Sequence, residues 1–287
     1  MVQYNPKAWF SLIFKFHKSD TFRILMPAML CLGVYGLVVA YVLLDYFELT
    51  FKSSTILHSL LGFVISLLLV FRTNTAYDRW WEARKLWGAL VNNSRNMSIK
   101  AKAFFPESDY LYVLTLLGNF SIALKHHLRS EGSLEKLKSC EGFEVNSIAH
   151  KKHIPNALAN LLFSKTNELY KNQAITGDQF IIINNELASL TDITGACERI
   201  KNTPIPYSYS LFIKKFIFVY TLTIPFGLLG DFGYWVAPIN MFIFYALTSL
   251  EVIAEEIEDP FGNESNDLPT DQIAENINKS ITEIFEK

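Results

Sequence analysis

The sequence predicts an all-α membrane protein with four transmembrane helices and a further helical part in water. Half of its 287 residues are hydrophobic and 19% are charged, which is too apolar for a typical soluble domain and too charged for a chain buried entirely in lipid. Four separate apolar segments are candidates to cross a bilayer. The remainder lacks the period-two alternation of strands, so helices are expected there too.

Residues 1–23 place basic side chains among large aromatic ones. Lys7, Lys15 and Lys18 alternate with Trp9 and other apolar residues. The pattern predicts a short amphipathic helix at the membrane interface, and a helix packed on the protein itself fits it equally well. No small-residue cleavage site follows, so we expect no cleaved signal peptide.

Residues 24–71 contain the first two predicted spans. Residues 24–44 carry no charge and are long enough to cross the hydrocarbon core, and residues 56–71 form a somewhat shorter second span. Lys and Arg are enriched before the first span and after the second. This asymmetry predicts that both flanks are cytoplasmic, and with an even number of spans both termini are cytoplasmic as well.

The stretch 57–90 organises the chain, because it passes from an apolar half into a charged half without a proline. We predict a single helix that crosses the bilayer and continues into water. Phe63, Leu67 and Phe71 are four residues apart and form an apolar ridge, which in an assembly around an axis could form rings that gate by dewetting. Small and hydroxylated residues form a stripe beside the ridge, and on pattern alone ordinary helix packing is the favoured interpretation.

The predicted cytoplasmic part covers residues 72–210. Periodicity predicts helices at 110–129 and 156–171, separated by a charged loop. A third helix is predicted at 178–200, with Asp178 as its cap.

The third and fourth predicted spans lie within residues 211–250 and form an out-and-back hairpin. Residues 216–229 and 235–250 are each marginal in length, and a glycine-containing turn separates them. We predict a single domain over residues 1–287, in which residues 251–287 form an acidic C-terminal segment.

The acidic segment opens with five carboxylates in nine residues, namely Glu251, Glu255, Glu256, Glu258 and Asp259. Carboxylates at i and i+4 repel on a helix, and a helix C-terminus disfavours negative charge. The cluster therefore requires cations from elsewhere, either Lys and Arg side chains or a bound metal. A salt-bridged face is the favoured interpretation, although hard oxygen ligands on a turn also suit calcium.

The histidines give weaker signals. His150 and His153 have a possible metal-ligand spacing, but in a charged loop we expect them to be solvated. His126 and His127 are adjacent, so a helix would point them apart. His58 lies at the start of the second span, where it is either a functional residue at membrane depth or a residue among lipid headgroups.

No catalytic motif is present, and nothing supplies a nucleophile with a base, so we do not expect an enzyme. The net charge of −2 argues against nucleic acid as a partner. Cys31, Cys140 and Cys197 are isolated. They predict no disulfide framework, which fits a reducing cytoplasmic interior.

Two long motifs carry a family resemblance. FRTNTAYDRWWEARKLWG at residues 71–88 and EVIAEEIEDPFGNESNDLP at residues 251–269 resemble the bestrophin family in its bacterial and plant-like branch. The four-span layout resembles this family over nearly the whole chain. The resemblance implies a homopentameric ion channel in the cell membrane, with a central pore along the five-fold axis.

The resemblance also implies where the pore narrows. Counting back from Arg79 and Trp80, which match the family's motif, places the three residues of the family's apolar neck on Phe63, Leu67 and Phe71. The resemblance therefore reverses the preference for simple packing. The family has a second constriction on a helix of its soluble part, for which Ile181 is the candidate.

Calcium binding is a further implication. Vertebrate relatives hold calcium with the segment after the last span, where Glu256, Asp259, Glu264 and Asp267 occupy the matching positions. Carboxylates stand here at two places where the vertebrate pattern has amides. We expect no required cofactor, and a divalent cation or Arg pairing at the acidic loop remain alternatives.

The sign of the permeant ion is open, because apolar rings do not select charge and the mouths of a pore do. We expect monovalent cations, Na⁺ or K⁺, because the outer loop with Asp45, Glu48 and Lys52 is net negative and the branch looks bacterial. A chloride channel of the same fold and a membrane scaffold that does not conduct are the alternatives.

Overall fold

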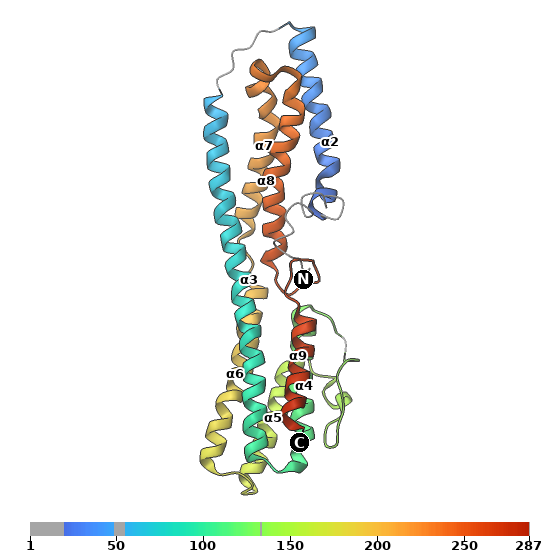
Figure 1. Ribbon diagram of the computed structural model, residues 1–287, viewed down its shortest axis with the longest axis vertical. Helices are drawn as coiled ribbons and strands as arrows, with labels where there is room; N and C mark the ends of the chain where they lie inside the picture. The colour runs from blue at the N-terminus through green and yellow to red at the C-terminus, as the bar shows by residue number, and fades with distance from the viewer. Residues whose placement is uncertain (1–19, 49–54, 133, 287) are drawn as a thin grey trace. The chain divides into compact units, whose positions relative to one another are not determined.

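The computed structural model describes residues 20–48, 55–132 and 134–286, and these residues are predominantly helical. The described residues contain eight long helices, which are labelled in Figure 1. They are α2 (Asp20–Tyr41), α3 (Ile56–Phe104), α4 (Tyr110–Leu128), α5 (Ile154–Lys171), α6 (Gly177–Asn202), α7 (Tyr207–Phe232), α8 (Val236–Glu258) and α9 (Thr270–Phe285). The β structure of the described residues is limited to one isolated bridge between Cys140 and Phe143. The predicted all-α class is confirmed.

Short turns of other helix types join these elements. A π-helical turn, Val42–Tyr46, follows α2, and the 3₁₀ turns are Glu107–Asp109, Val145–Ile148 and Gly233–Trp235. The interfacial helix predicted for residues 1–23 lies outside the described residues, apart from its last four positions, which begin α2.

The described residues form two compact units. The first, which we call the polar unit, contains residues 80–203 and 259–286, and the second, the apolar unit, contains residues 20–79 and 204–258. Helix α3 contributes to both units, because it continues without interruption for 49 residues. The single helix predicted from residues 57–90 is therefore present and is longer than predicted.

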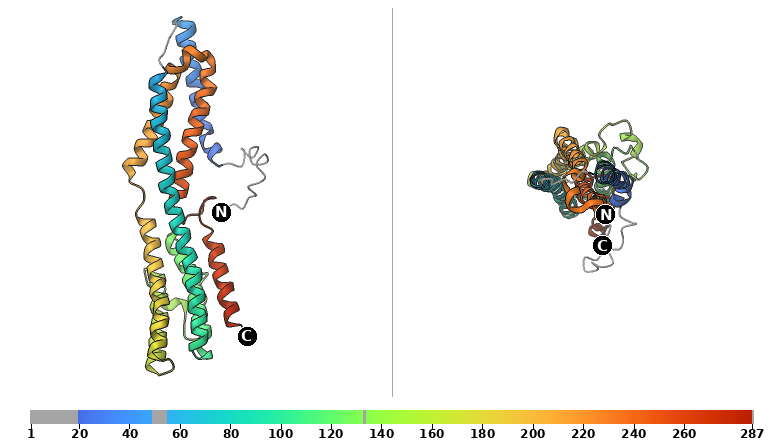
Figure 2. Two further views of the ribbon diagram at one scale, coloured as in Figure 1. Left: turned by 60° about the vertical axis from the view of Figure 1, so that its left-hand side comes forward. Right: turned by 90° about the horizontal axis from the view of Figure 1, so that it is seen from above.

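The polar unit is a helical bundle with its own hydrophobic core. The C-terminal part of α3 lies beside α4, α5, α6 and α9 in both views (Figures 1 and 2). Large side chains such as Trp87, Phe120 and Leu124 are almost completely buried. Burial of this apolar surface stabilises the unit without help from lipid.

Helix α6 starts earlier than predicted, and its cap is Thr176 rather than Asp178. The Thr176 hydroxyl accepts the backbone N–H of Gln179 at 3.3 Å, and the Gln179 side chain accepts the N–H of Thr176 at 2.9 Å. This reciprocal pair is a capping box, which satisfies two backbone donors at once. Asp178 lies in the first turn, where its charge suits the helix dipole.

Helix α9 was not predicted, because the acidic character of residues 251–287 dominated the interpretation. Ile273, Ile277 and Ile281 recur every four residues and are buried against the core of the polar unit. Asp271 in its first turn accepts hydrogen bonds from Lys125 of α4 and from Arg129, the residue that follows α4, each at 2.7 Å. The helix is thus held by an apolar stripe and by an ion-paired N-terminus.

The apolar unit contains α2, the N-terminal part of α3, α7 and α8. Three stretches are long and apolar enough to cross a membrane: Thr21–Tyr46, Ile56–Phe104 and Tyr207–Glu258. The last contains both α7 and α8, so it holds two helices separated by the turn Gly233–Trp235. Helix α7, with 26 residues, is far longer than the predicted segment 216–229.

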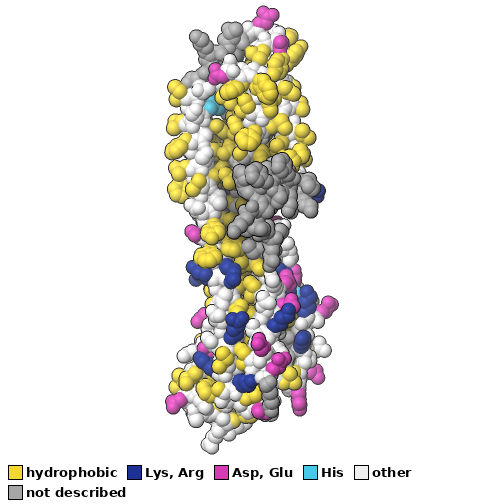
Figure 3. All heavy atoms as spheres, viewed as in Figure 1, with side chains coloured by type: hydrophobic (Ala, Val, Ile, Leu, Met, Phe, Trp, Pro, Cys, Tyr) yellow, Lys and Arg dark blue, Asp and Glu magenta, His cyan; other side chains and the backbone are white. Residues whose placement is uncertain are grey.

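Helices α2 and α8 approach each other closely at one glycine, although little of the apolar unit is buried. A Cβ at Gly36 would lie 3.1 Å from the Cα of Ala237, so this glycine allows α2 and α8 to approach closely. In the most apolar windows of the three candidate spans only 17 to 22% of residues are buried. Figure 3 shows hydrophobic side chains gathered over this unit, and charged side chains gathered over the polar unit.

Candidate functional site

The predicted neck residues lie on the outward face of α3. Phe63, Leu67 and Phe71 are 66%, 45% and 55% exposed, whereas Ile65 and Leu69 between them are fully buried. At about 100° per residue, the exposed ridge and the buried one lie on opposite sides of the helix. The three bulky side chains therefore face away from the rest of their own chain.

Contacts on the buried side fix this orientation. Ile65 and Leu69 pack against Ile213 and Ile217 of α7. Two tyrosines of α7 also donate hydrogen bonds to backbone carbonyls of α3, Tyr209 to Leu68 at 3.1 Å and Tyr220 to His58 at 3.3 Å. These contacts prevent α3 from rotating about its axis, so the opposite face, which carries the ridge, stays outward.

His58 also attaches α3 to α7. Its Nε2 atom donates to the carbonyl of Thr223 at 3.0 Å, because a carbonyl can only accept. Gly227 makes room for the ring, since a Cβ there would lie 2.6 Å from the imidazole. The structure therefore places His58 between α3 and α7 rather than on an open surface.

Arg72 lies directly after the neck ridge and is buried, with 1% of its surface exposed. Its Nη2 atom lies 2.6 Å from Oε2 of Glu258, and its Nε atom lies 3.5 Å from Oε2 of Glu251, which is 2% exposed. The other oxygen of Glu258 accepts the N–H of Ile205 at 2.7 Å. Removing one partner of a buried ion pair leaves an uncompensated charge, so the members of this network depend on one another.

This network links the neck helix to the C-terminal end of α8. Arg79, two turns beyond Arg72 on α3, donates from Nε to the carbonyl of Glu258 at 3.2 Å. Lys214 of α7 contacts Glu255 at 2.8 Å. Three of the five clustered carboxylates, Glu251, Glu255 and Glu258, are therefore paired with Lys or Arg, as the favoured interpretation of the cluster expected.

The four residues predicted as calcium ligands divide between the units. Glu256 lies in α8 of the apolar unit, whereas Asp259, Glu264 and Asp267 lie in the turn before α9. Asp267 is buried, and its Oδ2 atom accepts the N–H of Glu264 at 2.6 Å. A Cβ at Gly262 would lie equally close to that oxygen. Asp267 therefore braces the turn, and calcium binding stays a prediction.

The same turn is anchored to neighbouring helices of the polar unit. Trp80 Nε1 donates to the carbonyl of Asn266 at 3.0 Å, and Arg129 Nε donates to the carbonyl of Phe261 at 3.1 Å. Asp259 accepts the N–H of Phe261 at 3.4 Å. Both residue runs of the family motif thus meet here, through Trp80 of one and the turn of the other.

Ile181, the candidate for the second constriction, lies on α6 and is 63% exposed, while Ile183 nearby is buried. Within the polar unit, the same part of α6 is tied to α3. Lys100 forms an ion pair with Glu186 at 2.6 Å, and Asn93 donates to the Glu186 carbonyl at 2.9 Å. Ile181 is therefore a fixed, outward-facing apolar residue, and its role stays a prediction.

Two polar residues of the ridge were missed from the sequence. Asn74 and Asp78 are exposed on α3 and continue the line of Phe63, Leu67 and Phe71, because they lie three and seven positions beyond Phe71. The spacing of seven residues between Phe71 and Asp78 in the sequence is the signal that places Asp78 on this ridge. A carboxylate here matters, because copies of a chain around an axis multiply its charge.

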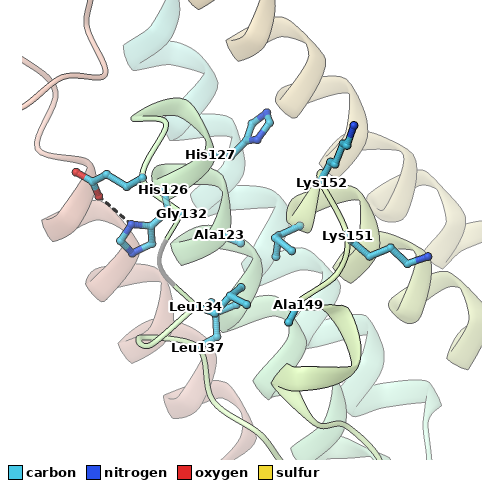
Figure 4. Close-up of a pocket in the computed structure, with 11 residues that line it drawn as sticks. Ala123, His126, His127, Gly132, Leu134, Leu137, Ala149, Lys151 and Lys152 are labelled. Carbon is cyan, nitrogen blue, oxygen red and sulfur yellow. Dashed lines mark hydrogen bonds and ion pairs between the residues drawn. The ribbon is translucent and has the colours of Figure 1, made fainter.

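A small pocket in the polar unit has a volume of about 170 Å³ (Figure 4). Leu134, Leu137 and Ala149 are among its lining residues, together with His126 and Lys151. This volume is below that of typical ligand pockets, which start at about 300 Å³.

His126 and His127 point apart, as predicted. His126 contacts Glu131 at 2.9 Å, and burial lowers the pKa of His126 despite that carboxylate. His127 instead contacts Glu198 of α6 at 2.6 Å. His150 is exposed, as expected, whereas His153 is only partly exposed and contacts the same Glu198 oxygen at 2.8 Å.

The chain matches the family described as Bacterial/Fungal Bestrophin protein over residues 1–283. Among curated proteins, it is 34% identical to the voltage-dependent anion channel-forming protein alr2987 of Nostoc sp., covering 97% of this chain and 92% of that protein. It is 30% identical to the voltage-dependent anion channel-forming protein YneE of Escherichia coli K12, covering 95% and 90%.

A solved structure has the same fold. The crystal structure of a bacterial bestrophin homolog from Klebsiella pneumoniae superposes with a TM-score of 0.84 at 27% sequence identity, covering 91% of this chain and 98% of that chain. The match extends over nearly the full length in every comparison. The chain is therefore a membrane protein that belongs to the bacterial/fungal bestrophin family.

Proposed function

We propose that this protein is an anion channel in which several copies of the chain, five by resemblance to the family, surround an axial pore. The exposed apolar ridge of α3 is the observation that supports this most directly. Three bulky side chains one turn apart are held outward by contacts on the opposite face. In a ring of copies, such side chains form stacked apolar collars that narrow a water-filled path.

One chain cannot enclose such a path, so the proposal requires an oligomer. The exposed faces of α3, α7 and α8 provide apolar surface for lipid and for neighbouring copies. Basic residues flank the first two spans on one side, which supports the proposal that both termini are cytoplasmic. Four spans result if α7 and α8 cross separately.

Anions, rather than the cations expected from the sequence, are the proposed permeant ions. The relatives that cover almost the whole chain are named voltage-dependent anion channel-forming proteins. The cation expectation rested on a net negative outer loop. In the structure, Asp45 of that loop accepts a hydrogen bond from Tyr234, and Lys52 lies outside the described residues.

Ions cross the neck only when water fills it. Collars of Phe and Leu disfavour water, so a small change in their spacing changes the barrier to ions of either sign. Arg72 follows Phe71 directly and is fastened to Glu251 and Glu258 of α8. A movement of the C-terminal end of α8 would therefore move Arg72, and with it Phe71, the last apolar residue of the neck.

Cation conduction through the same pore is the second candidate, and Asp78 is the observation that favours it. Its carboxylate lies on the same ridge, just beyond the neck. A ring of carboxylates attracts cations and repels anions. If anions pass, Asp78→Asn should raise anion conductance by removing this repulsion, whereas in a cation channel it should lower the conductance.

The experiment is a reversal potential, measured with the purified protein in planar bilayers under a KCl gradient. A reversal potential near the chloride equilibrium value supports the anion proposal, and a value near that of potassium supports the second candidate. Absence of any current, with the protein oligomeric and correctly inserted, would contradict a channel and favour a scaffold. Changing Phe63, Leu67 and Phe71 together to Ala should increase the current by removing the collars.

A further inference from the structure

Three potential metal ligands meet in the polar unit, and none of them is assigned to conduction. His127 is in the last turn of α4, His153 is the residue that caps α5, and Glu198 is near the end of α6. One ligand atom from each lies within 4.8 Å of the other two. Among the residues that the structure describes, no other group of His, Cys, Asp or Glu meets this criterion.

The distances within the group are short. Nε2 of His127 lies 2.6 Å and Nε2 of His153 lies 2.8 Å from the same oxygen of Glu198, and the ring centroids are 4.4 Å apart. Ligand atoms of a tetrahedral zinc site are each about 2.0–2.2 Å from the ion. The three side chains therefore need only small outward movements to admit an ion between them.

The environment suits a charged ligand set that an ion can reach. The three side chains are each between 28% and 30% exposed, so the site is open to water at one side. Burial alone would raise the pKa of Glu198, but hydrogen bonds from both histidines outweigh it and hold that pKa below its ordinary value. Glu198 is thus a carboxylate at neutral pH.

The neighbouring Cys197 is not part of the group. It is fully buried, and burial raises the pKa of its thiol to about 12. Its sulfur is not among the ligand atoms that lie together, so it is not a donor of this group. The donor set is therefore two imidazole nitrogens and one carboxylate oxygen, with a fourth position for water.

Without an ion, the group is a satisfied hydrogen-bond cluster. Nδ1 of His153 accepts the backbone N–H of Asn156 at 3.1 Å and so caps α5. The ring proton of neutral His153 is then on Nε2 and points to Glu198. Metal binding at Nε2 moves this proton to Nδ1 and breaks the cap, so the site must gain more from the ion than it loses at the helix end.

We propose that His127, His153 and Glu198 bind a first-row transition metal ion of the Zn²⁺ type and thereby join α4, α5 and α6. Two imidazoles with one carboxylate and an open position are a common zinc ligand set. Calcium and magnesium prefer oxygen ligands, so they fit the group poorly. The proposal does not depend on the ion that the channel conducts.

The test is a titration of Zn²⁺ into the purified full-length protein, in competition with a chromogenic chelator. Wild type should bind one ion per chain at this site. His153→Ser should weaken binding by tenfold or more, although serine can still cap α5. The matched control is His150→Ser, an exposed histidine of the same loop, which should bind as wild type does.

A second readout separates loss of the ligand from loss of the fold. Zn²⁺ should raise the midpoint of thermal unfolding in wild type and not in Glu198→Gln, whose amide retains the size and an acceptor oxygen. Circular dichroism without metal should show both variants folded. Failure of wild type to bind Zn²⁺, or equal weakening by His150→Ser and His153→Ser, would overturn the proposal.

Discussion

The polar and apolar units differ in how far they bury large aromatic side chains. Phe120 in the polar unit is 1% exposed and Trp87 is fully buried, whereas Phe63 and Trp235 in the apolar unit are mostly exposed. The polar unit buries its own hydrophobic surface, so water is sufficient as its surroundings. The apolar unit leaves that surface for lipid, for other copies of the chain or for a pore.

Charges show the reverse pattern. In the polar unit Arg199 and Glu82, which are 66% and 43% exposed, form an ion pair at the surface. In the apolar unit Arg72 and Glu251 are almost completely buried together. Exposed pairs contribute little to stability, whereas the members of a buried pair depend on each other.

The largest loss of stability is expected when a buried phenylalanine, rather than an exposed one, is truncated. Phe120→Ala should destabilise the polar unit by about 3–5 kcal/mol, because it leaves a cavity in a packed core. The matched change Phe63→Ala should alter stability by about 0.5 kcal/mol or less, as at other exposed positions. Thermal unfolding of each purified variant measures this, and equal losses would remove the distinction between the units.

A similarly large effect is expected from the buried pair. Arg72→Met should cost about 3–5 kcal/mol, because Glu251 and Glu258 are left without their cation. Lys214→Met at the exposed pair with Glu255 should cost about 1 kcal/mol or less. If both changes cost the same in unfolding experiments, the Arg72 network is not the fastening of the neck helix that the structure indicates.

The capping box of α6 should have a smaller effect. Thr176→Ala removes the acceptor for the Gln179 N–H and should cost about 1 kcal/mol. Thr191→Ala, on the exposed side of the same helix, is the control and should be neutral, since alanine favours helices. A loss confined to Thr191→Ala would show that the cap is not formed.

The smallest effect is the expected change in stability at acidic pH. Burial acts to raise the pKa of Asp271, but hydrogen bonds from Lys125 and Arg129 outweigh it and lower that pKa to about 2. Because the folded pKa lies below the unfolded one, this group stabilises the protein above about pH 4 and the contribution is lost as the pH falls towards 2. Solvent screening limits it to about 1 kcal/mol or less. Asp271→Asn should flatten the unfolding curve against pH in this range, and an unchanged curve would contradict the assignment.

Local patterns predicted much of the fold. The uninterrupted helix of α3, its apolar ridge and the outward position of Phe63, Leu67 and Phe71 follow from periodicity within one helix. Helix α9 was within reach too, because Ile273, Ile277 and Ile281 have helical spacing. The segment was instead interpreted by its acidic residues, so the apolar stripe was not used.

Contacts between distant segments could not be predicted in this way. His127, His153 and Glu198 are 26 to 71 residues apart along the chain, the larger separation being that of the hydrogen-bonded pair His127 and Glu198. Only the packing of α4, α5 and α6 brings them together. The partners of Arg72 were similarly invisible, although the need of the acidic cluster for cations correctly indicated that such partners exist.

The central claim is that the ridge of α3 faces a water-filled path between copies of the chain. Leu67→Cys, made in a background with Cys31→Ser because Cys31 is exposed, should render the current in planar bilayers sensitive to a charged, water-soluble thiol reagent. Phe242→Cys, at an exposed position of α8, is the control and should remain insensitive. A current through the Leu67→Cys protein that the reagent leaves unchanged, or equal block of both variants, would contradict the claim.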